Sequence, residues 1–199
     1  TMPLWDDTVR SFVAMGGAVM VPLILVGVLL WYLLLLRYFS LRRGVTGPVA
    51  AALTRARSDG NPPRGVLGEA IAELLSLRSK RALAPSDIEP VIQQRRQQLK
   101  RHGRVILALV AAAPLLGLLG TVRGMIETFH ALTEMALVSE SGGISGGISE
   151  ALVTTQMGLA IAIPGMLVAR ILEGRARRLR RDLDELAAVA PAALGRGAP

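Results

Sequence analysis

The stretch SFVAMGGAVMVPLILVGVLLWYLLLL, residues 11–36, decides the fold class of this chain. It holds 26 residues without a charged side chain and is closed by Arg37. An apolar helix of about 20 residues is long enough to cross the hydrocarbon layer of a bilayer. Asp6 and Asp7 precede the stretch, whereas a cleaved signal peptide begins with basic residues. The pattern therefore predicts a retained transmembrane helix over residues 15–36.

Two further apolar blocks each have the length of one bilayer crossing. One begins at Val105 and continues past Arg123, and the other leads up to Arg170. Apolar residues make up 51% of the chain and gather into these three blocks, which is the distribution of a membrane protein. We expect an all-α, polytopic membrane protein with three transmembrane helices and long cytoplasmic helical extensions; the second and third spans lie at 105–138 and 150–170.

The charges between the spans predict the orientation, because Lys and Arg are retained on the cytoplasmic side. Residues 42–104 carry 13 basic and 5 acidic side chains, and residues 170–199 carry 7 basic and 4 acidic ones. Residues 127–150 hold four Glu and no basic side chain. This asymmetry explains the net charge of +8 without nucleic acid, and the basic segment lacks the interleaved aromatic residues of a nucleic-acid site.

The predicted topology places the N-terminus in the periplasm and the C-terminus in the cytoplasm of a bacterial inner membrane. The connecting segments are an outer N-terminus at 1–14, a cytoplasmic helical segment at 37–104, a short periplasmic loop at 139–149 and a cytoplasmic tail at 171–199.

The predicted cytoplasmic segment contains residues that are typical of helix ends and helix starts. Gly60-Asn61-Pro62-Pro63 is a break, and the amphipathic stretch around Ile71 and Leu74 after it predicts one or two short helices. Ser86-Asp87-Ile88-Glu89 has the capping-box pattern that begins a helix. We expect this helix to run into the second span, about 75 Å long if unbroken to residue 138. The glycine-rich stretch after residue 139 predicts a tight turn.

Small residues recur at helical spacing in the second and third spans, and such stripes let helices approach closely in lipid. We interpret most of these glycines as helix packing. The residues are Ala113, Gly117, Gly120 and Gly124 in the second span, and Ala151, Thr155, Gly158, Ala162 and Gly165 in the third.

Polar residues at membrane depth are candidates for an ion path. Thr121 and Thr155 each lie near a small-residue stripe and could line a shared interior, although a Thr hydroxyl can also bond its own helix. Arg123 and Glu127, four residues apart, could pair on one face or extend toward the interface. Glu150 could favour the N-terminus of the third span or belong to the ion path.

The sequence offers no enzyme chemistry. There is no cysteine, and His102 and His130 have no partners at metal-ligand spacing. No nucleophile, base and orienting group can be combined from these residues, so we expect a protein without cofactor that is not an enzyme.

Two motifs carry a resemblance to a known family. APLLGLLGTVRGMI at 113–126 closely resembles the second-span signature of the ExbB/TolQ/MotA proton-channel family, and its ExbB members in particular. ISEALVTTQMGL at 148–159, followed by AIPG at 162–165, resembles the third-span signature. Over the first span the likeness is one of topology alone.

The resemblance implies a homopentameric ring around an ExbD-like single-span subunit, which uses the proton gradient to drive a TonB-like protein. It implies that Thr121 and Thr155 line the pore and that Glu150 is the acidic residue at the top of the third span. Arg123 departs from the aromatic residue that many ExbB proteins have there, and with Glu127 it is a candidate for the pore rim. The expected packing or kink positions are Pro114, Gly117, Gly120, Gly124, Gly158 and Pro164.

Several functions remain open within this class. The leading expectation is energy transduction for TonB-dependent transport across the outer membrane. A TolQ-like role in envelope maintenance, a motility-type stator, and a passive membrane scaffold without ion conduction are the alternatives.

Overall fold

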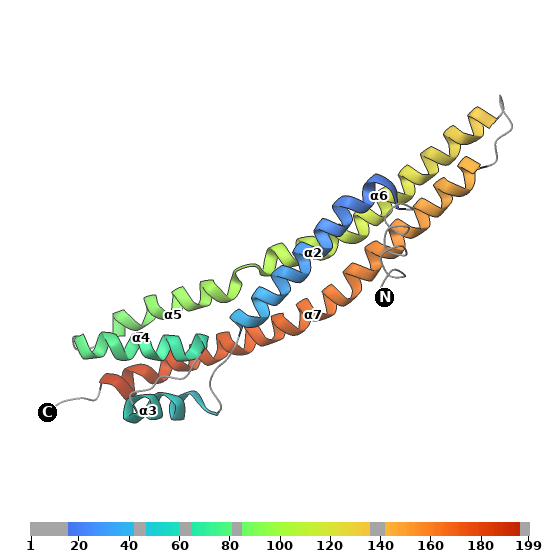
Figure 1. Ribbon diagram of the computed structural model, residues 1–199. Coiled ribbons are helices and arrows are strands. Elements are labelled where there is room, and N and C mark those ends of the chain that lie inside the picture. Colours follow the sequence, from blue (N-terminus) through green and yellow to red (C-terminus); the bar gives the residue numbers. More distant parts are fainter. Residues whose placement is uncertain (1–15, 42–46, 60–64, 81–84, 136–141, 196–199) are drawn as a thin grey trace, which may run out of the picture. The chain divides into compact units, whose positions relative to one another are not determined.

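A computed structural model describes residues 16–41, 47–59, 65–80, 85–135 and 142–195, and every regular element within these ranges is an α-helix. The all-α prediction is therefore confirmed. Figure 1 shows the helices in chain order: α2 (Gly17–Ser40), α3 (Val49–Asp59), α4 (Val66–Lys80), α5 (Pro85–Lys100), α6 (Gly103–Met135) and α7 (Gly142–Gly195).

Among the described residues, three helical stretches are long and apolar enough to cross a membrane, as predicted, and they belong to α2, α6 and α7. The 24 residues of α2 measure about 36 Å at 1.5 Å per residue. The 33 residues of α6 and the 54 of α7 reach about 50 Å and 81 Å, which exceeds the roughly 30 Å of a hydrocarbon core. Both helices therefore extend beyond a bilayer.

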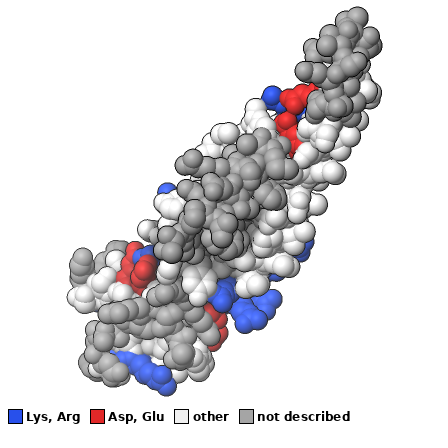
Figure 2. All heavy atoms as spheres, turned by 45° about the vertical axis from the view of Figure 1, so that its right-hand side comes forward, with Lys and Arg blue, Asp and Glu red and all other residues white. Residues whose placement is uncertain are grey.

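One compact unit contains the described parts of Thr1–Leu34 and Val105–Ala169. Its core joins α2, α6 and α7 through Met20, Leu23, Ala113, Val153 and Ala162. The outward side chains are also apolar, including Leu25 on α2, Leu118 on α6 and Leu152 on α7, each more than half exposed. Wide areas of the face in Figure 2 carry no Lys, Arg, Asp or Glu. Such a surface suits contact with lipid or with other apolar helices.

The other unit contains the described parts of Leu35–Arg104 and Arg170–Pro199. Ile71 and Leu74 of α4 are fully buried, so the expected amphipathic face is present. The C-terminal half of α7 joins this unit as an amphipathic helix. Its buried positions recur every three or four residues and are Leu172, Ala176, Leu179, Leu183, Leu186, Ala190 and Leu194.

The expected continuous helix from the cytoplasmic segment into the second span is interrupted. α5 ends at Lys100 and α6 begins at Gly103, and His102 between them has φ of 64°, in the left-handed region. A Cβ at Gly103 would lie 2.9 Å from Nη1 and 3.0 Å from Nη2 of Arg37. The new helix thus begins at a glycine that leaves room for a guanidinium from α2.

The glycine-rich loop expected at 139–149 is wrong over its second part, because α7 already begins at Gly142. A Cβ at Gly147 would meet Thr128 Oγ1 and the Gly124 carbonyl oxygen. Gly147 therefore allows α7 and α6 to pack closely, whereas the sequence had predicted that it forms part of a turn. Residues 136–141 lie outside the described residues.

Candidate functional site

The site begins with a close contact between α6 and α7. A Cβ at Gly117 would lie 3.1 Å from both the Thr154 carbonyl oxygen and Thr155 Cα. A Cβ at Gly158 would lie 2.8 Å from the Ala113 carbonyl oxygen. Since both neighbours are backbone, the two helices touch main chain to main chain here, as small-residue stripes permit.

The same contact continues toward the start of α7. A Cβ at Gly120 would overlap the side chain of Thr154, and one at Gly124 would meet the Gly147 carbonyl oxygen and lie 3.0 Å from Ala151 Cβ. The structure thus places four of the glycines predicted for packing at the interface of α6 with α7: Gly117, Gly120, Gly124 and Gly158.

Two threonines of this region, Thr155 and Thr121, make different hydrogen bonds. Thr155 Oγ1 lies 3.3 Å from the carbonyl oxygen of Gly117 on α6 and 3.2 Å from that of Ala151 on its own helix. Thr121 is partly exposed and donates to the Leu118 carbonyl oxygen at 2.7 Å. Because Thr121 follows Gly117 by one helical turn, both threonines lie along the same stretch of the α6–α7 pair.

Charged side chains gather at one end of this stretch. Arg123 Nε lies 3.0 Å from Glu127 Oε1, so the expected pair four residues apart is present. Arg123 Nε also lies 3.8 Å from Glu150 Oε1. The Glu150 side chain is 11% exposed, whereas the side chains of the other two are nearly half exposed.

The surroundings of Glu150 differ from one of its two expected roles, that of favouring the N-terminus of its own helix. It is the ninth residue of α7, well inside the helix. Its carboxylate instead lies against Gly17, the first residue of α2, where an added Cβ would overlap it. The helix N-terminus beside Glu150 therefore belongs to the first span.

The two prolines of the candidate site stand inside continuous helices. Pro114 lies within α6 and Pro164 within α7. Each removes one backbone N–H from its helix. Next to Pro164, a Cβ at Gly165 would lie 2.7 Å from Leu30 Cδ2, so this part of α7 packs closely on α2.

Three residues of this region were not singled out from the sequence. Thr128 is buried and donates to the Gly124 carbonyl oxygen at 2.8 Å, and Gly147 packs against it. Gly147 precedes Ala151 by one turn, so extending the small-residue stripe backward would have found it. Gly17 had no such signal, because its importance arises from a contact with a distant part of the chain.

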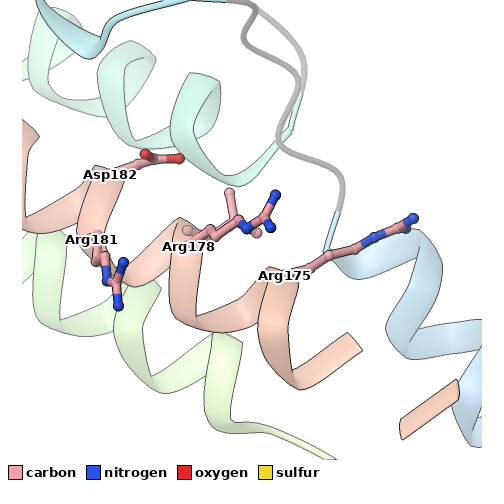
Figure 3. A pocket seen from close by; sticks show the side chains of 5 residues that line it. Arg175, Arg178, Arg181 and Asp182 are labelled. Atoms are coloured by element: carbon pink, nitrogen blue, oxygen red, sulfur yellow. The ribbon is translucent and has the colours of Figure 1, made fainter. Parts of the chain in front are cut away.

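The unit that includes the C-terminal part of α7 holds a second group of charges. A pocket of about 400 Å³ is lined by residues of α7, namely Arg175, Arg178, Leu179, Arg181 and Asp182. Figure 3 shows the four charged side chains among them. The Arg175 guanidinium also lies 5.2 Å from the centre of the Tyr38 ring, a cation–π contact. These arginines belong to the segment that the charge pattern predicts to be cytoplasmic.

A buried ion pair joins α2 to α7 in this unit. Arg37 Nη2 lies 2.7 Å from Glu173 Oε2, and the Arg37 side chain is 4% exposed against 38% for Glu173. About three turns further along α7, Asp184 forms an ion pair with Arg96 of α5, with 2.5 Å between Oδ1 and Nη2.

Three apolar helices long enough to cross a membrane, two of them with closely packed backbones, define a polytopic helical membrane protein. The chain belongs to the MotA/TolQ/ExbB proton channel family, whose model matches residues 61–185. This is not a family of enzymes.

Individual relatives agree with this assignment. The ExbB-like 1 biopolymer transport protein of Synechocystis sp. is 32% identical over 174 residues, covering 79% of this chain and 67% of the relative. The ExbB-like 3 protein of the same organism is 38% identical over 85 residues, or 42% of this chain and 40% of the relative. The biopolymer transport protein ExbB of Neisseria meningitidis is 30% identical over 194 residues, covering 85% of this chain and 87% of the relative.

Proposed function

We propose that this chain is an ExbB-like subunit of a channel in the bacterial inner membrane that is driven by the proton-motive force. It energises TonB-dependent transport across the outer membrane. It acts as a homopentamer around an ExbD-like single-span subunit, and the complex passes motion to a TonB-like protein. The likeness to biopolymer transport proteins named ExbB, one of them matched over most of its length, supports this role. One charge crossing 100 mV supplies about 2.3 kcal/mol, a useful energy when summed over several protons.

One arrangement carries the proposal. Thr155 bonds across to Gly117, one turn before Thr121, and the charged side chains of Arg123, Glu127 and Glu150 stand beyond them. Polar groups therefore follow one another along two apolar helices, where they are costly unless they serve a function. In the proposed complex, Thr121, Thr155 and Glu150 form the ion pathway, and Arg123 and Glu127 lie at its rim.

The orientation is part of the proposal. The segments at 37–104 and 171–199 lie in the cytoplasm, and 1–14 and the connection before α7 lie in the periplasm. The excess of Arg and Lys in the first two segments supports this orientation.

The test uses the full chain co-purified with the ExbD-like subunit and reconstituted in liposomes under an imposed potential. Proton influx is read with an entrapped pH-sensitive dye. Thr121→Val and Thr155→Val keep the shape of the side chain and remove the hydroxyl. We expect each to lower influx by about tenfold, the effect of losing roughly 1.4 kcal/mol of stabilisation along the path.

The matched control is Thr133→Val. Thr133 is also on α6 and donates to its own helix, to the Phe129 carbonyl oxygen at 3.0 Å, but lies beyond the proposed pathway. Normal influx in both pathway variants, with the complex intact, would refute the pathway. A wild-type complex that assembles and passes no protons would favour the passive scaffold.

A further inference from the structure

The N-terminus of α2 has a feature that the prediction of a transmembrane helix over residues 15–36 does not explain. Gly17 begins the helix with φ of 57°, in the left-handed region that favours glycine. A Cβ at this position would overlap Oε1 of Glu150 and lie 2.7 Å from Oε2. Only a residue without a side chain leaves space for this carboxylate.

Glu150 has few other partners. The Glu150 side chain is 11% exposed, and its Oε1 accepts no hydrogen bond from the described residues. Its nearest cation, Arg123 Nε, lies 3.8 Å away and is closer to Glu127, at 3.0 Å. A buried carboxylate with such weak pairing needs another source of stabilisation.

The start of α2 can supply it. The first turn of a helix has backbone N–H groups without partners inside the helix, and the helix dipole places partial positive charge there. The Glu150 carboxylate lies against the first residue of that turn. A weakly paired carboxylate, whose Oε1 accepts no hydrogen bond from the described residues, and a helix N-terminus are thus brought together from distant parts of the chain.

We propose that Gly17 is a positioning residue for Glu150: it lets the N-terminus of the first span hold the carboxylate beside the ion pathway. The first span is then part of the working site and more than an anchor. The consequence for proton flow rests on the function proposed for Glu150, whereas the contact itself can be tested without it.

The contact is tested by the rate at which dicyclohexylcarbodiimide, an apolar reagent for carboxyl groups, labels Glu150 in the purified complex. Peptide mass spectrometry locates the label. Gly17→Ala should displace the carboxylate from its buried place and raise the labelling rate by roughly two- to fivefold, the factor to which typical helix-terminus stabilisation corresponds. Gly146→Ala, a glycine of α7 with no described neighbour within 4 Å of the added carbon, should leave the rate unchanged. An unchanged rate in Gly17→Ala would overturn the proposal.

Proton influx in liposomes then separates positioning from backbone strain. Gly17→Ala should reduce influx, and the double variant Gly17→Ala/Glu150→Asp should recover part of it, because the side chain shortened by one methylene makes room for the new methyl. Shortening Glu150 does not relieve strain at φ of 57°. A double variant no better than Gly17→Ala would mean that the glycine is needed for backbone conformation alone, which contradicts the proposal. Glu150→Gln serves as the reference: if its influx is normal, the function proposed for Glu150 fails, and the labelling result still decides the contact.

Discussion

The ion pair between Arg37 and Glu173 predicts an unequal response to removing either partner. Arg37 is 4% exposed, its Nε has no hydrogen-bond partner among the described residues, and Glu173 Oε2 lies 2.7 Å from its Nη2. Glu173→Ala would leave a buried guanidinium without a counter-charge, which costs about 3 kcal/mol or more. Arg37→Met keeps most of the volume and leaves a carboxylate that is already 38% exposed to water, so we expect a cost of about 1 kcal/mol or less.

Heat denaturation of the purified full chain in detergent, followed by circular dichroism, measures the difference. For a chain of this size, 1 kcal/mol shifts the midpoint by about 2–4 °C. The expected gap of roughly 2 kcal/mol therefore places the midpoint of Glu173→Ala about 4–8 °C below that of Arg37→Met.

The double variant Arg37→Met/Glu173→Ala is the control, because replacing both partners of a buried pair is often nearly neutral. We expect its midpoint to lie above that of Glu173→Ala. If Arg37→Met were as damaging as Glu173→Ala, the charge of Arg37 would not be the costly buried group, and the reasoning from burial would be refuted.

Three smaller predictions use the same measurement. Gly158→Ala should cost about 1–3 kcal/mol, because the methyl would lie 2.8 Å from the Ala113 carbonyl oxygen, and a normal midpoint would contradict the close helix contact. Gly146→Ala should be neutral or stabilise by up to about 1 kcal/mol, since Ala is the better helix former and the position is open; a clear loss would mean that it is packed. Asp184→Asn should change stability by no more than about 0.5 kcal/mol, because its pair with Arg96 is partly exposed, and a drop of several degrees would contradict this.

The membrane helices could be predicted because their signal is local. A bilayer requires about 20 consecutive apolar residues whatever the rest of the chain does, so residues 11–36 alone were sufficient to expect the first span. Its end was less certain: α2 continues to Ser40, beyond Leu36, because Arg37 is accommodated in the helix by pairing with Glu173.

The glycine-rich segment before Glu150 was misread for a physical reason. Glycines favour turns when nothing else acts on them, and the sequence does not reveal that another helix lies close by. In the structure Gly147 contacts Gly124 and Thr128 of α6. Because Gly147 has no side chain, α7 can pack closely against α6 at this point. His102 shows the converse case: the residue that takes the left-handed conformation is not a glycine, and the single Gly103 after it was not enough to predict that the helix is interrupted there.

The sequence by itself determined the number of spans, the class of protein and the membership of the family, because apolar length, charge asymmetry and the motifs at 113–126 and 148–159 are properties of consecutive residues. Only the tertiary structure decided that Thr155 bonds to α6 and that Glu150 meets the start of α2 at Gly17. Such contacts depend on how each helix is rotated about its axis and on residues far away in the sequence, 38 positions in the first case and 133 in the second. No local pattern contains that information.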